Sequence, residues 1–326
     1  MSGYRYDFEK PIAELEHRLQ EAQKAADREQ HPETVKALEL QLEALKRKIY
    51  GSLTPWQRVQ IARHPQRPYT LDYITALMSD FVQIHGDRLF GDDRALIGGM
   101  AKFEGRPCMV LGHQKGRDTK ENLMRNFGSA HPEGYRKALR LFQMAQKFHL
   151  PVIVFIDTPG AYPGIGAEER GQAHSIAYNL REMARIATPI YLCVIGEGGS
   201  GGALGVGIGD WMAMLENAYY SVISPEGCAA ILWRDRARAP DAAAALKLTA
   251  ADLMQLGIVD ETIEEPLGGA HRDPQVIAER LRASILRFLK TVEATPAEIL
   301  LQQRYERFRR IGAFSSAQQT ALSPAV

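Results

Sequence analysis

Residues 196–209 concentrate glycine at a level that regular secondary structure rarely tolerates. They read Gly-Glu-Gly-Gly-Ser-Gly-Gly-Ala-Leu-Gly-Val-Gly-Ile-Gly, and they directly follow an apolar run over 190–195. Glycine loses more backbone entropy on folding than any other residue, so this composition weakens an ordinary helix or strand. It suits a strand-to-helix turn whose N–H groups approach an anion, because a helix N-terminus carries partial positive charge. The segment is therefore a candidate anion cradle made of main-chain donors.

We expect the donors in this turn to be the backbone amides of Gly201, Gly202 and Ala203. These residues are predicted to form the first turn of a helix, where N–H groups have no acceptor inside the helix. Removing one donor that stabilises an oxyanion typically lowers a rate by about 10²–10³-fold. The amides of Gly201 and Gly202 are therefore candidate catalytic groups, and Ala203 is a candidate for binding substrate.

A second loop rich in glycine and proline follows the preceding apolar run, 151–156. It reads Asp157-Thr-Pro-Gly-Ala-Tyr-Pro-Gly-Ile-Gly166. Two prolines and three glycines fix a loop of defined shape, which is either a rigid connection or one wall of a pocket. We interpret it as a pocket wall, with N–H groups near Gly160 and Ala161 available as donors.

Other chemistries for the glycine-rich turn are weaker. Gly198-x-Ser200-x-Gly202 matches the nucleophile elbow of serine hydrolases, and Asp260 and His271 follow in the required order, but surplus glycine makes such a match easy by chance. A phosphate-binding P-loop is excluded because no Lys-Ser/Thr follows the glycines. A dinucleotide-binding fold lacks the full fingerprint with its ribose-binding acid.

Basic residues gather in two segments, 115–125 and 234–238, which contain Lys115, Arg117, Lys120, Arg125, Arg234, Arg236 and Arg238. They form either a solvated face or a site for a phosphorylated or carboxylated ligand, which the planar fork of arginine suits. Glu168, Glu169 and His174 follow the second loop and could serve as acid or base from the helix after it. We assign the glutamates to helix-cap electrostatics and His174 to a structural role.

The elements that must carry these loops alternate between strand and helix. Apolar runs predict strands over 95–103 and 108–113 (a hairpin), 151–156, 190–195, 211–215, 219–223 and 258–263. Helices are expected over 70–82 with Thr70 as cap, 134–149, 167–187, 226–233, 250–256 and much of 275–310, while 114–133 is polar and mobile in character. This order predicts an α/β fold with a mostly parallel sheet, in which ligands bind at the carboxyl ends of the strands.

The first fifty residues differ from the rest. Apolar residues recur at alternating spacings of three and four, first at Phe8, Ile12, Leu15, Leu19, Ala22 and Ala26 and then at Val35, Leu38, Leu42, Leu45 and Ile49. Both are heptad seams, and His31-Pro32 separates them, which predicts a helical hairpin. The seams can be buried against each other, the body of the protein or a partner chain; we favour a partner.

Composition restricts the class of protein. The chain has 326 residues, 45% hydrophobic and 24% charged, with a net charge of +1, which gives no argument for nucleic-acid binding. No signal peptide or membrane span is expected. The three cysteines, Cys108, Cys193 and Cys228, are far apart in apolar surroundings and indicate buried thiols in a reducing cytosol. No cluster indicates a metal site.

Several segments together carry a family resemblance. They are Gly112-His-Gln-Lys-Gly-Arg-Asp-Thr-Lys120, Asp157-Thr-Pro-Gly-Ala-Tyr-Pro-Gly164, Gly166-Ala-Glu-Glu-Arg-Gly171, Gly196-Glu-Gly-Gly-Ser-Gly-Gly-Ala-Leu204, Ser221-Val-Ile-Ser-Pro-Glu-Gly-Cys228 and Pro266-Leu-Gly-Gly-Ala-His271. The chain resembles the carboxyltransferase alpha subunits of bacterial acetyl-CoA carboxylase, in order, from the N-terminal helices to about residue 310. A departure is Gly205, where many relatives have alanine, and 314–326 looks like a variable tail.

The resemblance implies a crotonase-like fold of repeated ββα units behind the N-terminal hairpin. The expected domains are the hairpin over 1–50, the carboxyltransferase domain over 51–295, and a C-terminal helix and tail over 296–326. It also implies transfer of a carboxyl group from carboxybiotin to acetyl-CoA, giving malonyl-CoA for fatty acid biosynthesis. A stand-alone acyl-CoA hydratase or isomerase of the crotonase type, a serine hydrolase and a non-catalytic scaffold are the alternatives.

The resemblance further implies a site shared with a separate beta subunit in a cytoplasmic α2β2 assembly. On this basis Gly201 and Gly202 stabilise the oxyanion of biotin, and Gly160, Ala161 and Ala203 line the carboxybiotin pocket. Arg234 and Arg236 are candidates for contacts with the CoA phosphates. Biotin carboxyl carrier protein and biotin carboxylase are the further partners. The family's zinc ribbon belongs to the beta chain, and in the family's scheme the biotin enolate removes the methyl proton, so this chain needs no bound cofactor or side-chain base.

Overall fold

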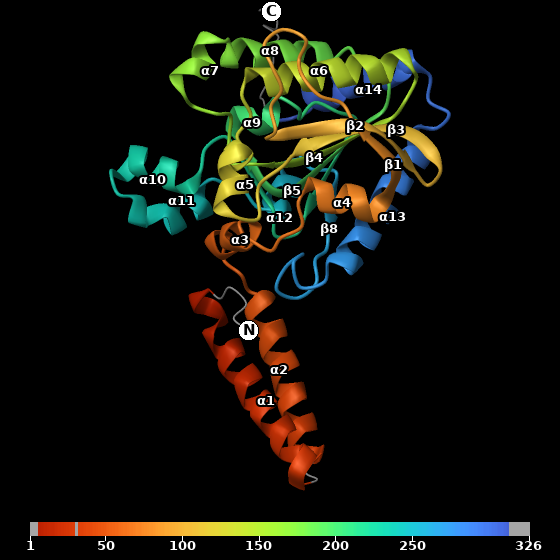
Figure 1. Ribbon diagram of the computed structural model, residues 1–326. Helices are drawn as coiled ribbons and strands as arrows, with labels where there is room; N and C mark the ends of the chain where they lie inside the picture. The colour runs from red at the N-terminus through yellow and green to blue at the C-terminus, as the bar shows by residue number, and fades with distance from the viewer. Residues whose placement is uncertain (1–5, 30–31, 313–326) are drawn as a thin grey trace, which may run out of the picture.

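The computed structural model describes residues 6–29 and 32–312, and its centre is a mixed sheet between layers of helices (Figure 1). Eight strands in these residues follow the order β1-β2-β3-β4-β5-β6-β8, with β7 paired to the end of β5. They are β1 (Met78–Gln83), β2 (Leu96–Phe103), β3 (Arg106–His113), β4 (Val152–Thr158), β5 (Ile190–Gly199), β6 (Trp211–Leu215), β7 (Tyr219–Ser221) and β8 (Glu261–Ile263). The first three strands are antiparallel, and all later pairings are parallel.

Helices connect these strands and cover the sheet. The described α-helices are α1 (Lys10–Glu29), α2 (Pro32–Tyr50), α3 (Pro55–Ala62), α4 (Thr70–Leu77), α5 (Thr119–Met124), α6 (Pro132–Lys147), α7 (Ile165–Glu169), α8 (Gln172–Met183), α9 (Ser200–Leu204), α10 (Pro225–Trp233), α11 (Ala239–Ala245), α12 (Ala250–Gln255), α13 (Pro274–Val292) and α14 (Ala297–Arg309). Short 3₁₀ turns are η1 (Asp7–Glu9), η2 (Asn126–Gly128) and η3 (Arg236–Arg238).

The apolar runs of β4 and β5 form the centre of the core. Every residue of both strands is buried, as expected for parallel strands with helices on both faces. In Figure 1, α6 and α8 lie over one face of the sheet, and α4 and α13 lie on the other. Because β4 and β5 are parallel neighbours, the loops that follow them start at the same edge of the sheet. The predicted hairpin of β2 and β3 and the mostly parallel remainder are confirmed.

The helix predicted over 70–82 is confirmed only in its first part. The structure ends α4 at Leu77, and the chain continues as edge strand β1, which the sequence analysis missed. Pairing of β1 with β2 outweighs the weak local preference of these residues. Thr70 is not the cap: Tyr69 occupies that position, and the hydroxyl of Thr70 instead donates to the carbonyl of His113 at 2.5 Å.

Two further boundaries differ from expectation. The helix predicted over 167–187 is broken into α7 and α8 by Gly171, whose φ of +80° is the left-handed conformation that glycine adopts readily. The strand predicted over 190–195 continues to Gly199, because its glycines pair with β7. The polar segment 114–133 contains α5, which Asp118 caps by accepting a hydrogen bond from the amide of Glu121.

The N-terminal helices form the predicted hairpin, which projects from the body (Figure 1). Most described seam residues of the two helices pack in one cluster, together with Ile61 of α3, that is separate from the main core; they are Phe8, Ile12, Leu15, Leu19, Leu42, Leu45 and Ile49. Lys46 and Glu16 form an ion pair across the two helices. The seams are thus buried against each other and the root of the body; burial against a partner chain stays a prediction. The seam position Ala26 lies outside the residues whose side chains are described.

The last helix, α14, is tied to the body by Arg304, whose side chain is buried. This guanidinium donates to Asp210 and to the carbonyls of Met183, Ile186 and Thr188. Residues 314–326 of the predicted tail lie outside the described residues. Over 6–29 and 32–312, no helix combines the length and apolar composition that a membrane span requires.

Candidate functional site

The two glycine-bearing loops meet backbone to backbone. A Cβ atom on Gly202 would lie 2.5 Å from the carbonyl carbon of Gly160 and 2.7 Å from the amide nitrogen of Ala161. A Cβ atom on Gly199 would lie 2.2 Å from the carbonyl oxygen of Pro159. No other residue type allows the main chains to approach so closely. The structure therefore brings together the two glycine-bearing loops that were identified separately in the sequence.

The turn that carries the candidate donors is compact. Gly199 precedes α9, and Ser200 has a φ of +50°, which reverses the chain so that Gly201 and Gly202 begin the helical turn. Only five residues form α9, so the donors owe their direction to this turn and not to the dipole of a long helix. Gly201 is partly exposed, whereas Gly202 and Ala203 are buried.

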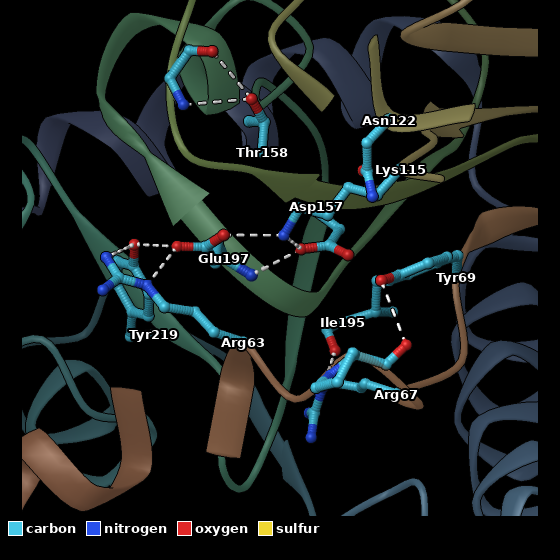
Figure 2. A network of polar contacts seen from close by, with 12 residues as sticks. Arg63, Arg67, Tyr69, Lys115, Asn122, Asp157, Thr158, Ile195, Glu197 and Tyr219 are labelled. Atoms are coloured by element: carbon cyan, nitrogen blue, oxygen red, sulfur yellow. Dashed lines mark hydrogen bonds and ion pairs between the residues drawn. The ribbon is translucent and has the colours of Figure 1, made fainter. Parts of the chain in front are cut away.

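The loop after β4 offers fewer donors than expected. The hydroxyl of Thr158 accepts a hydrogen bond from the amide of Gly160 at 3.1 Å and donates to the Gly160 carbonyl at 2.9 Å (Figure 2). Gly160 therefore shapes the loop, with a φ of +153°, and its amide is already engaged. Ala161 remains as the candidate donor on this wall.

A buried polar network lies directly below the two loops (Figure 2). The ammonium of Lys115 bridges Asp157 of β4 and Glu197 of β5, at 2.6 Å and 2.8 Å. The other oxygen of Glu197 accepts from the Nε of Arg63 and from the hydroxyl of Tyr219, each at 2.7 Å. Arg63 also pairs with Glu226 at the start of α10. The network joins the residue after α3 and the elements β4, β5, β7 and α10 at the edge where the loops begin.

The charges in this network stabilise one another. Burial alone raises the pKa of Glu197, but Lys115 and Arg63 outweigh it and lower this pKa to about 2. Burial likewise lowers the pKa of Lys115, but Asp157 and Glu197 outweigh it and hold that pKa above its ordinary value. Lys115 is therefore a fixed cation and Glu197 a fixed anion at neutral pH. Neither group is poised to exchange protons with a substrate.

A second buried ion pair supports the same edge from below. Arg67 pairs with both oxygens of Glu265, and its Nε donates to the carbonyl of Ile195 at 2.6 Å. Glu265 also accepts hydrogen bonds from the amides of Asn217 and Ala270. The pair fixes the middle of β5 against the segment that follows β8.

The two basic segments have different surroundings. Lys115 is partly buried and engaged in the network, Arg117 pairs with Asp72 and lies over the ring of Tyr69, and Arg125 pairs with Glu121. Arg234 and Arg236 are exposed on the projection formed by α10 and α11, where the neighbouring Arg238 pairs with Asp241 (Figure 1). The segment 115–125 is thus largely engaged internally, whereas Arg234 and Arg236 face solvent.

The serine hydrolase alternative is wrong because its three residues make no triad. Asp260 accepts hydrogen bonds from the amide of Met212 and from Arg307. The ring of His271 stacks on His64 with centroids 3.6 Å apart, and neither of its nitrogens has a hydrogen-bond partner among the described residues. Asp260 therefore does not orient His271, and His271 does not activate Ser200.

The sequence analysis missed the residues that hold the site together. Asp157 and Glu197 are carboxylates next to buried apolar runs, and this signal alone could have marked them as paired charges. Arg63 had no such signal, since only the fold brings it to this edge. Glu168, Glu169 and His174 are exposed, and the ring of His174 stacks on Tyr178. The described residues contain no cluster of three or more groups able to ligate a metal.

Comparison with known proteins supplies the family. The family described as "Acetyl co-enzyme A carboxylase carboxyltransferase-like" matches residues 5–312. The chain is 56% identical over 315 residues to the acetyl-coenzyme A carboxylase carboxyl transferase subunit alpha of Geobacter metallireducens, covering 96% of this chain and 99% of that protein. The subunit of the same name from Halalkalibacterium halodurans is 55% identical over 311 residues, covering 95% and 96%. The chain belongs to the acetyl-CoA carboxylase carboxyltransferase alpha-subunit family.

Solved structures agree with this family at the level of the fold. A Pseudomonas malonate decarboxylase hetero-tetramer in complex with coenzyme A matches with a TM-score of 0.59 and 17% identity, covering 74% of this chain and 97% of that chain. Transcarboxylase 12S matches with a TM-score of 0.55 and 18% identity, covering 80% and 46%. The alpha subunit thus has the crotonase-like carboxyltransferase fold. Its activity is carboxyl transfer to acetyl-CoA, and the stand-alone hydratase or isomerase is not favoured.

Proposed function

We propose that this alpha subunit supplies the carboxybiotin half of a shared active site and that a beta subunit supplies most of the acetyl-CoA half. Transfer breaks the bond between the carboxyl carbon and the ureido nitrogen of biotin and forms a carbon–carbon bond to the acetyl methyl carbon. The first change leaves negative charge on the ureido oxygen. The second requires an enolate with charge on the thioester oxygen, and the methyl proton that is lost passes to the biotin enolate left by the first change. Two oxyanions need two sets of donors, and this chain offers one.

Backbone amides of the two loops are the donors for the biotin oxyanion. Gly201 and Gly202 begin the helical turn of α9, and Gly202 contacts the amide of Ala161 on the opposite wall. Ala203 and the loop conformation set by Gly160 complete the pocket. The single observation that carries the proposal is this backbone contact, because it directs main-chain donors of both loops toward one place. Amides fixed in this way stabilise developing charge without reorganising during the reaction.

The wider assembly follows the alpha-subunit family. We infer an α2β2 complex with the beta subunit, served by biotin carboxyl carrier protein and biotin carboxylase in the cytoplasm. Carboxybiotin, carried on its own protein, and acetyl-CoA are substrates, and no cofactor is expected to be attached to this chain. Arg234 and Arg236 stay candidates for the CoA phosphates: both are exposed on the projecting α10–α11 unit, where they are accessible to an anion.

Substitution at the loop contact tests the proposal. Gly202→Val places a branched side chain where a Cβ atom already lies 2.5 Å from Gly160, so the walls must separate. We expect carboxyl transfer by the complex reconstituted with the beta subunit to fall by about 10²-fold or more, as when an oxyanion donor is lost. Ser200→Ala, two residues earlier in the same turn, is the matched control and should keep its activity.

Two results would contradict this assignment. Unchanged malonyl-CoA formation by the Gly202→Val complex would show that the backbone contact is not part of the catalytic site. Loss of activity in Ser200→Ala with an intact complex would show that the hydroxyl of Ser200, and not the backbone, does the chemistry. Size-exclusion chromatography of each reconstituted complex separates a catalytic defect from a failure to assemble.

A further inference from the structure

The ammonium of Lys115 is a side-chain link between the ends of β4 and β5. Its Nζ contacts the Oδ1 of Asp157 at 2.6 Å and the Oε2 of Glu197 at 2.8 Å. The same Asp157 oxygen accepts a hydrogen bond from the amide of Glu197 at 2.9 Å. Asp157 shortly precedes Gly160, and Glu197 shortly precedes Gly201. The link therefore lies at the base of both loops that form the pocket.

Regular strand pairing does not fix these loops. The parallel register of β4 and β5 runs to the pair Ile156 and Val194, then shifts so that Thr158 pairs with Gly198. The extra residues of β5 form an irregular segment whose amides and carbonyls need other partners. Asp157 accepts from the amide of Glu197, and Arg67 donates to the carbonyl of Ile195. After Val194, side-chain hydrogen bonds therefore take the place of regular backbone pairing between β4 and β5. This is the segment that determines how far apart the two loops lie.

Two glycines leave space for this link. A Cβ atom on Gly196 would lie 2.5 Å from the Oδ1 of Asp157, so glycine allows the carboxylate to rest on the backbone of β5. A Cβ atom on Gly128 would lie 2.9 Å from the Cγ of Lys115. The lysine stem and the carboxylate are therefore held by packing as well as by charge. The positions of these two side chains are therefore fixed well enough to determine the distance between the ends of β4 and β5.

We propose that Lys115 is a positioning residue for the transfer reaction: by clamping Asp157 to Glu197, it sets the spacing of the two loops that present the oxyanion donors. The inference rests on the proposed function of those loops. Lys115 acts through the backbone and does not contact the reacting atoms. A misplacement of about 1 Å in a catalytic site can cost about 10²-fold in rate, so a modest change in loop spacing has a large effect.

A charge-balanced variant separates positioning from simple stability. Lys115→Met alone leaves the buried Asp157 without the ion pair it makes among the described residues, which threatens folding. Lys115→Met/Asp157→Asn removes one cation and one anion, and the amide oxygen of the new side chain can still accept from the amide of Glu197. Asp157→Asn alone keeps an oxygen that can accept both hydrogen bonds, from Lys115 and from the amide of Glu197, but removes the negative charge. It serves as the milder second variant.

The control removes a buried ion pair at the opposite end of β5. Arg304 and Asp210 are 2.7 Å apart, and Asp210 also accepts from the amide of Ile190 at the start of this strand. Arg304→Met/Asp210→Asn therefore loses the same kind of interaction without touching the loops. Each variant is reconstituted with the beta subunit. Malonyl-CoA formation gives kcat and the KM for acetyl-CoA, and thermal unfolding gives the midpoint.

The proposal expects a specific pattern. Lys115→Met/Asp157→Asn should lower kcat by about 10- to 100-fold, as expected for displaced groups, with a KM for acetyl-CoA within about twofold of wild type. Asp157→Asn should lower kcat by less than the double variant does. Arg304→Met/Asp210→Asn should keep its kcat even where its unfolding midpoint falls further.

Three outcomes overturn it. The first is a wild-type kcat in the Lys115→Met/Asp157→Asn complex. The second is a kcat that falls in both double variants in proportion to the unfolding midpoint, because the network is then only structural. The third is an Asp157→Asn defect larger than that of the double variant. If the wild-type complex itself forms no malonyl-CoA, the proposed function fails first and this inference fails with it.

Discussion

Glycines of the site serve three different physical purposes, although the sequence presents them as one composition. Gly202 has no unusual φ, but its missing side chain lets α9 contact the 160–161 peptide. Gly160 instead adopts a φ of +153° that L-residues rarely adopt. Gly196 makes room for the carboxylate of Asp157. The spacing of glycine could indicate a cradle, but only the fold shows which glycine is needed for approach, which for conformation and which for packing.

His113 is a buried titratable residue near these loops. It is fully buried, and its ring nitrogens have no hydrogen-bond partner among the described residues. Burial, and then the charge of Lys115, lower the pKa of His113 to about 3 against a smaller opposing effect of the Gly202 backbone. The imidazole is therefore neutral in the folded protein at the pH of any assay. A neutral ring preserves the charge balance around Lys115.

Stability should depend on pH through this histidine. Its folded pKa of about 3 is below the ordinary value of about 6.5, so the unfolded chain binds a proton first as pH falls. The contribution is complete above pH 6.5 and is lost as pH falls toward 3. Between pH 7.5 and pH 5, His113→Leu should reduce the loss of unfolding free energy by about 2 kcal/mol. Denaturant unfolding at pH 7.5 and pH 5 measures this difference in the free energy of unfolding. If the variant and the wild type lose the same free energy of unfolding between the two pH values, His113 is not a neutral buried histidine.

At the scale of elements, the sequence predicted the strands that are both apolar and paired regularly. It placed β4, β6 and the β2–β3 hairpin well, because burial on both faces selects continuous apolar runs. It ended β5 too early, at 195, because glycine weakens a strand on intrinsic grounds, whereas pairing of Gly198 and Gly199 with β7 extends it. It missed β1, whose edge residues have no apolar pattern. Predictions from local sequence preference were therefore wrong where pairing with a strand distant in the sequence determines the structure.

The same distinction applies to the site. Both glycine loops were predicted, because turn chemistry is local and parallel strands bring their carboxyl ends together. The Lys115 network was not predicted, because its members come from the residue after α3, from β4, β5 and β7, and from the segment after β3. From the sequence, Lys115 belonged to a basic segment that forms either a solvated face or a site for an anionic ligand. The structure instead surrounds it with carboxylates, which a sequence without contacts cannot reveal.

A buried carboxylate, Glu9, helps to join the hairpin of α1 and α2 to the body. Glu9 accepts from the hydroxyl of Tyr50 at 2.6 Å and from Arg272 at 3.1 Å, and it also accepts from the amide of Tyr6. These contacts link the start of α1, the end of α2 and the segment before α13. The direction in which the hairpin projects (Figure 1) is therefore set at its root.

Tyr50→Phe should loosen this root. Losing a hydrogen bond to a buried carboxylate costs about 1.5–3 kcal/mol, and denaturant unfolding should show a loss in this range. Limited proteolysis should cut the hairpin faster than in wild type. Arg47→Met is the control on the same helix, since it removes only an exposed pair with Glu43 and should cost less than about 0.5 kcal/mol. Equal effects of the two substitutions would exclude a specific role for the root.

For the whole molecule, the proposed function assigns one set of backbone donors to this chain, and the charged groups nearest to these donors are paired with one another. Asp157 and Glu197 are committed to Lys115, and His271 is committed to a stack with His64. Carboxyl transfer needs a second oxyanion site for the acetyl-CoA enolate. Under the proposed function this chain supplies one of the two oxyanion sites, and a partner chain must supply the other.

Reconstitution tests this division of labour. The alpha subunit alone should form no malonyl-CoA from carboxybiotin and acetyl-CoA, because an isolated half-site stabilises one of the two charges. Adding the beta subunit should produce activity at a rate that saturates at equal amounts of the two chains, and a tagged alpha subunit should copurify a chain with a zinc ribbon. The Gly202→Val subunit should still copurify that chain, since the loop contact is internal to alpha. Malonyl-CoA formation by the alpha subunit alone would contradict the shared site, because both oxyanions would then be stabilised within one chain.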